Sequence, residues 1–171
     1  MTKLLLENLL RFLLLILAQV FVFKNLGYYN IVAAFPYIMA LMLLPVRISK
    51  GLLFLLAFLT GITVDMFYDT LGIHAAACVT LAWVRIVFLN LTLQDDDHDS
   101  LSSPGIGQMS FRWFLIYSFL LGLFHHFTLY FLESFTLNNI WFTLVSILLS
   151  CIFTTILIVL FELIFYRRRK R

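Results

Sequence analysis

The sequence carries little charge. Of its 171 residues, 12 are Lys or Arg and 9 are Asp or Glu, so that charged residues make up 12% of the chain and hydrophobic residues 63%. A soluble domain has roughly 25% charged residues. One domain of this length cannot shield so much apolar surface from water, which argues against a soluble globular enzyme, and the same composition excludes a disordered chain. Most of the protein is therefore expected to lie in lipid.

Cysteine is also scarce. Cys78 and Cys151 both lie inside apolar runs, where they are expected to pack as small hydrophobic residues rather than form a disulfide. The acidic run Asp95–Asp99 lacks the glycine and glutamate positions of a calcium-binding EF-hand loop. It is expected to be a solvated loop, so the sequence predicts no metal site and no cofactor.

Long apolar runs are what the sequence has in abundance. Since a bilayer core requires about 20 apolar residues per helix, six runs are expected to be membrane helices: 4–23, 29–46, 51–70, 72–93, 111–133 and 140–166. The first run is too long for a signal peptide and is interpreted as an uncleaved helix. Pro36 is expected to kink the second. The sequence thus predicts an all-α integral membrane protein, a single six-helix bundle over residues 1–171 with a polar loop at 94–110.

The basic residues are distributed unevenly along this bundle. With both termini in the cytoplasm, the inner segments hold nearly all Lys and Arg residues, and Lys24 alone falls outside. This is the positive-inside pattern. Arg85 is expected to extend towards the inner surface. The basic tail (Arg167, Arg168, Arg169, Lys170 and Arg171) is expected to contact anionic lipid or a cytoplasmic partner rather than nucleic acid.

A stripe of small and acidic residues marks the third predicted helix. Its members are spaced four apart and so share one helix face: Ala57, Gly61, Asp65 and Asp69. Small side chains allow two membrane helices to approach closely. The next helix, after a turn at Gly72, offers His74, Ala75 and Cys78. We expect these two helices to pack tightly, with Asp65 as a buried acceptor that fixes the turn or pairs with a histidine.

Ionisable groups inside membrane helices suggest function by default. At a rise of about 1.5 Å per residue, His125, His126 and Glu133 of the fifth predicted helix reach the level of Asp65, Asp69 and His74, which predicts an outer polar cluster. Three interpretations stay open. The cluster holds the helices in register, borders a groove for another protein's membrane helix, or forms a small-molecule or proton site.

Catalytic interpretations find little in the sequence. An intramembrane aspartyl protease requires two carboxylates on facing helices, whereas Asp65 and Asp69 share one helix. No serine has the surroundings of an activated nucleophile beside a base. The chain is therefore expected not to be an enzyme.

The motif Gly61-Ile-Thr-Val-Asp65, followed by Leu71-Gly72-Ile-His74-Ala75, resembles the signature of the rod shape-determining MreD family. Residues 52–93 carry most of this resemblance, and length, short loops and basic tail agree in layout. The acidic insert at 94–103 departs from compact members and is similar to longer variants of the Bacteroidota type.

The resemblance implies a non-enzymatic, multi-pass scaffold of the bacterial inner membrane. Its implied partner is the bitopic protein MreC and, through it, MreB filaments, the polymerase RodA and a class B penicillin-binding protein. The family's fold is also similar to the substrate-binding subunits of energy-coupling-factor transporters. A small-molecule-binding subunit of such a transporter is therefore the alternative function.

Overall fold

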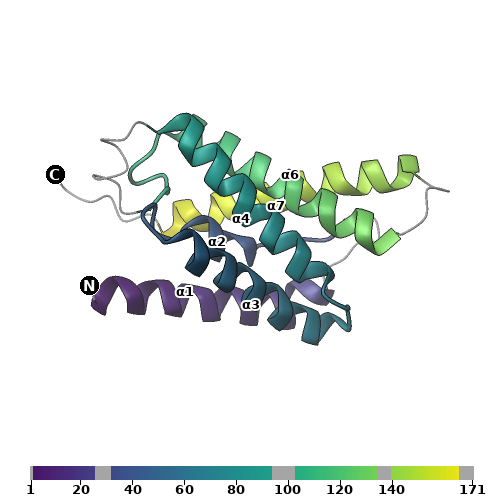
Figure 1. The fold of residues 1–171 in the computed structure, drawn as a ribbon. Helices are drawn as coiled ribbons and strands as arrows, with labels where there is room; N and C mark the ends of the chain where they lie inside the picture. Colours follow the sequence, from purple (N-terminus) through teal and green to yellow (C-terminus); the bar gives the residue numbers. More distant parts are fainter. Residues whose placement is uncertain (1, 26–31, 94–102, 135–139, 166–171) are drawn as a thin grey trace.

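The computed structural model describes residues 2–25, 32–93, 103–134 and 140–165, with side chains from residue 10 onward. Within these ranges the regular elements are all helices, and no sheet is formed. The elements are α1 (Thr2–Phe21), the 3-10 turn η1 (Phe23–Asn25), α2 (Ile38–Met42), α3 (Lys50–Tyr68), α4 (Ile73–Thr92), α6 (Phe111–Ser134) and α7 (Ile140–Phe165) (Figure 1).

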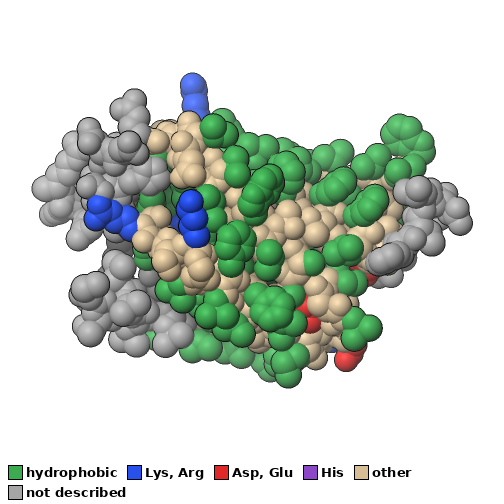
Figure 2. Space-filling model, in the orientation of Figure 1, with side chains coloured by type: hydrophobic (Ala, Val, Ile, Leu, Met, Phe, Trp, Pro, Cys, Tyr) green, Lys and Arg blue, Asp and Glu red, His purple; other side chains and the backbone are tan. Residues whose placement is uncertain are grey.

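Four of these helices could each cross a membrane, which indicates a multi-pass membrane protein. α3, α4, α6 and α7 contain 19, 20, 24 and 26 residues and are apolar enough to cross a bilayer. Their outer faces are lined with large exposed aliphatic and aromatic side chains, as expected where lipid replaces water (Figure 2). They begin and end within two residues of the predicted boundaries, and α1 has the length of the predicted first span.

The prediction of a continuous helix at 29–46 is wrong. Among described residues 32–46, only the five residues of α2 are helical, and the rest is extended or turned. Pro36 does more than kink a helix, because the helix does not form before it. We call residues 32–46 the buried segment, since residues 34–43 are all buried among the long helices.

The helices are arranged around this segment. α3, α4, α6 and α7 run back and forth between the two ends of the bundle, α2 lies in the middle, and α1 lies alongside α3 (Figure 1). α1 begins and α7 ends at the same end of the bundle, where α3 also begins. The Lys and Arg side chains visible in Figure 2 lie towards this end, and the acidic ones towards the opposite end.

Candidate functional site

Asp65 joins α3 to the start of α4. Its two carboxylate oxygens accept hydrogen bonds from the backbone N–H groups of His74 and Ala75, each at 3.0 Å. They also accept from the Thr70 hydroxyl at 2.5 Å, and the His74 imidazole lies 3.1 Å away. These backbone donors lie in the first turn of α4, whose orphan N–H groups and positive dipole end favour an anion. Asp65 therefore caps a helix other than its own, and both contacts predicted for it are present.

The chain reaches this geometry through two left-handed residues. Asp69, which ends α3, has φ 56°, and Gly72, which precedes α4, has φ 82°. A glycine adopts that conformation without strain, and an aspartate tolerates it better than most residues. The turn is thereby tight enough to bring the first residues of α4 onto Asp65.

The predicted close packing of these two helices is confirmed at Gly61. A Cβ atom there would overlap the Cα atom of Ala75 and lie 2.6 Å from the carbonyl oxygen of His74. Only glycine permits this approach. Ala57 and Cys78 are completely buried on the same two helices.

Backbone N–H groups of the buried segment donate hydrogen bonds to side chains of α7. The N–H groups of Ala33 and Phe35 donate to the hydroxyls of Ser150 and Thr154 in α7, at 3.0 and 3.1 Å. Alternate residues of an extended chain are about 6.6 Å apart, and residues four apart in a helix rise about 6 Å. The two spacings match, so one helix face serves as a partner strand would. This satisfies backbone groups that lipid cannot.

The other edge of the segment is paired with α1. The Gln19 side-chain amide donates to the carbonyl of Ala34 at 3.0 Å and to the hydroxyl of Tyr68 at 2.7 Å. Gln19 is completely buried. The side chain of one glutamine thus links α1 by hydrogen bonds to both the buried segment and α3.

Three buried histidines surround the ring of Phe35. Its centroid lies 5.6, 6.0 and 5.5 Å from those of His74, His125 and His126. We call these three residues the histidine cluster. Each is exposed by 3% or less. The space between them is therefore filled by an aromatic side chain.

Their hydrogen bonds run to three different elements. His125 Nε2 lies 2.9 Å from the hydroxyl of Tyr37, which lies 3.5 Å from Cys78 Sγ. His126 Nδ1 lies 2.7 Å from the Gly122 carbonyl, an acceptor only, so this nitrogen carries the proton of a neutral ring. His126 Nε2 then accepts from Thr154, at 3.2 Å. The cluster thus links α4, α6, α7 and the buried segment.

A second polar centre lies nearer the opposite end of the bundle. Arg85 is 1% exposed, and its Nη2 donates to the carbonyls of Leu44 and Pro45 at 2.6 and 3.2 Å. Its Nε faces the carbonyl of Met42, which also accepts from the Tyr117 hydroxyl at 2.8 Å. The prediction that Arg85 extends to the surface is wrong, because its guanidinium donates hydrogen bonds to carbonyls at the end of α2 and just after it.

The predicted site residues divide into two groups. Those brought together are Gly61, Asp65, Gly72, His74 and Ala75 at the turn, and His125 and His126 beside them. Asp69 and Glu133 are exposed and lie outside the buried cluster, so the predicted outer polar cluster loses two acidic members. Asp69 does not continue the helix face that carries Asp65, because α3 ends at Tyr68 and the backbone of Asp69 is left-handed. The basic tail 167–171 and the acidic run 95–99 lie outside the described residues.

Sequence reasoning missed the partners supplied by other helices and by the buried segment. These are Gln19, Phe35, Tyr37, Tyr117, Ser150 and Thr154. The spacing of Ser150 and Thr154 on one face of an otherwise apolar helix was the available signal. Of the described residues, no three His, Cys, Asp or Glu side chains lie together as metal ligands.

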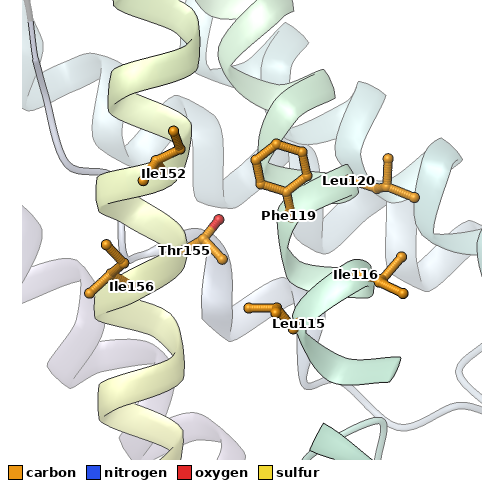
Figure 3. Close-up of a pocket in the computed structure, with 7 residues that line it drawn as sticks. All are labelled: Leu115, Ile116, Phe119, Leu120, Ile152, Thr155 and Ile156. Carbon is orange, nitrogen blue, oxygen red and sulfur yellow. The ribbon is translucent and has the colours of Figure 1, made fainter. Parts of the chain in front are cut away.

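A groove opens towards lipid between α6 and α7. It has a volume of about 400 Å³, and its lining is almost entirely apolar (Figure 3). The lining residues are Leu115, Ile116, Phe119, Leu120, Ile152, Thr155 and Ile156. We call this the α6–α7 groove. It shares no residue with the histidine cluster.

Comparisons of this chain with protein-family models, with curated proteins and with solved structures find no match.

Proposed function

We propose that this chain is a non-enzymatic scaffold of the bacterial elongation machinery, of the MreD type. In this proposal it lies in the inner membrane with both termini in the cytoplasm. It maintains cell shape by linking MreC and MreB filaments to the peptidoglycan synthases RodA and a class B penicillin-binding protein. The observation that carries the proposal is the α6–α7 groove, a surface to which the single membrane helix of MreC would bind.

The groove suits such an occupant. Helix association within a bilayer depends on van der Waals packing, because lipid is as apolar as the side chains. A hollow between two helices offers an incoming helix more contact than a convex face would. Ile116, Ile152 and Ile156 belong to the groove lining and are 54%, 47% and 51% exposed. They are available to a partner without any rearrangement of the bundle.

The interior supports a scaffold in a second way. The five motif residues behind the family resemblance, Gly61, Asp65, Gly72, His74 and Ala75, meet at a single helix junction. Their contacts hold backbone in place, as expected of a rigid platform. The alternative, a small-molecule-binding transporter subunit, predicts a cavity beside the histidines, whereas Phe35 fills the space between them.

The test is a groove-filling substitution in the bacterium of origin. Ile156→Trp adds bulk to the groove, and Leu55→Trp on α3 is the matched control because Leu55 is 53% exposed and lies outside the groove lining. We expect Ile156→Trp cells to become round and Leu55→Trp cells to remain rods, with equal protein in the membrane. Rod-shaped Ile156→Trp cells at normal protein level would contradict the proposed docking surface.

A further inference from the structure

The end of the bundle at which α3 begins contains a small pocket lined by two cations. Its volume is about 100 Å³, several times the space of a single water. Arg85 lies at its base, and Lys50, the first residue of α3, and Asn90, in the last turn of α4, lie at its mouth. The remaining lining is apolar: Val46, Ile48, Leu53, Ile86 and Leu89. We call this the Arg85 pocket.

The charge of Arg85 has no acidic partner in the part of the chain that the structure describes. Its guanidinium faces neutral groups, the backbone carbonyls of Met42, Leu44 and Pro45 and the hydroxyl of Tyr117. The buried carboxylate of Asp65 is paired elsewhere, with His74. A buried charge is unfavourable unless a counter-charge compensates it. Arg85 therefore produces a positive field that favours an anion at the pocket mouth.

Further positive groups surround this mouth. Lys50 is one of the lining residues and carries a positive charge. α3 begins at the same residue, after a Ser49 cap that accepts only from Leu52, so the positive end of the helix dipole adds to the field. Asn90 contributes an amide that donates hydrogen bonds. The site thus has a polar mouth of positive potential above apolar walls.

The depth of the site identifies the class of ligand. Asn90 lies two residues from the end of α4, and Arg85 lies five residues further along the helix, roughly 7.5 Å deeper than Asn90. A group at the mouth therefore lies at the level of lipid headgroups, above the hydrocarbon core. We propose that the Arg85 pocket binds the phosphate of an anionic phospholipid, with Lys50 and Asn90 in contact and Arg85 beneath. This site shares no residue with the α6–α7 groove.

The experiment uses the full chain in mild detergent with dioleoyl phosphatidylglycerol or dioleoyl phosphatidylcholine. Retained lipid is counted by native mass spectrometry. We expect one phosphatidylglycerol to be retained in preference to phosphatidylcholine. Lys50→Gln is expected to weaken this binding about fivefold, the usual effect of one basic residue near a membrane surface. Lys50→Glu is expected to weaken it further, although an acidic residue there favours the start of a helix and preserves the fold.

The matched control is Arg112→Gln, which removes a positive charge beside the start of α6 but outside the pocket lining. Equal weakening by Lys50→Gln and Arg112→Gln would overturn the proposal, since it would show a general charge effect. Equal retention of the two lipids would overturn it as well. Displacement of the lipid by millimolar inorganic phosphate would assign the site to free phosphate instead.

The acidic run that follows α4 is the competing occupant. If Asp95, Asp96 and Asp97 filled the pocket, the wild-type chain would show no lipid preference and replacement of all three by Asn would create one. That result would overturn the proposal. We expect the triple variant to retain phosphatidylglycerol to within twofold of the wild-type chain.

Discussion

The α3–α4 hairpin and the buried segment 32–46 satisfy their backbone groups in opposite ways. In the hairpin, the Asp65 carboxylate caps a helix that begins eight residues later, and Gly61 faces Ala75 across the turn. In the buried segment, the partners are side chains of α1, α4, α6 and α7, up to 119 residues away. The first arrangement is local, because its residues belong to one short motif of the sequence. The second depends on the whole bundle, so the two regions are expected to fail differently when altered.

The largest effect is expected at Arg85, which supports the end of the buried segment. Arg85→Met removes the donors to Leu44 and Pro45 and leaves buried carbonyls unsatisfied. We expect a loss of about 4 kcal/mol in unfolding free energy. The measurement is thermal unfolding in mild detergent, with Arg112→Met as the control. An unchanged melting temperature for Arg85→Met would show that the segment does not depend on this side chain.

A smaller effect is expected in the hairpin. Asp65→Asn removes the negative charge at the start of α4 and one of the two backbone acceptors, which we expect to destabilise the protein by about 2 kcal/mol. Cells carrying it are expected to be rounder and to retain less MreC, with the protein still inserted. Asp69→Asn is the control, because Asp69 is exposed and asparagine also tolerates its left-handed backbone.

If Asp65→Asn leaves both stability and cell shape unchanged at normal protein level, the capping interaction is dispensable. If the protein disappears from the membrane, Asp65 acts only through folding. The same thermal measurement separates these outcomes from a specific loss of partner retention.

The smallest effect is expected at one hydrogen bond between α7 and the buried segment. Thr154→Val keeps the shape of the side chain but removes the hydroxyl that accepts from Phe35 and bonds His126. A single polar contact between membrane segments contributes about 1 kcal/mol. We expect that loss, again by thermal unfolding. Thr128→Val is the control, since the Thr128 hydroxyl bonds only a carbonyl of its own helix on an exposed face. Equal melting temperatures would contradict this role of Thr154.

The same comparison explains which parts of the structure could be predicted from the sequence. The membrane class, the long helices and the packing of Gly61 against Ala75 follow from apolar length and i,i+4 spacing, which are local. The buried segment could not be predicted, because its apolar composition is that of a membrane helix. Its extended form depends on Ser150, Thr154 and Arg85, which lie far away in sequence. The position of Arg85 was predicted wrongly for the same reason, because the carbonyls that accept its hydrogen bonds are available only when that segment is not a continuous helix.

The most direct test of the proposed scaffold is an affinity pull-down of the tagged full chain from gently solubilised membranes of its own bacterium, read by mass spectrometry. The account predicts recovery of MreC with RodA and its class B penicillin-binding protein, and their loss from the Ile156→Trp variant but not from Leu55→Trp. Recovery of an ATPase pair with a transporter membrane subunit would contradict the scaffold and establish the alternative.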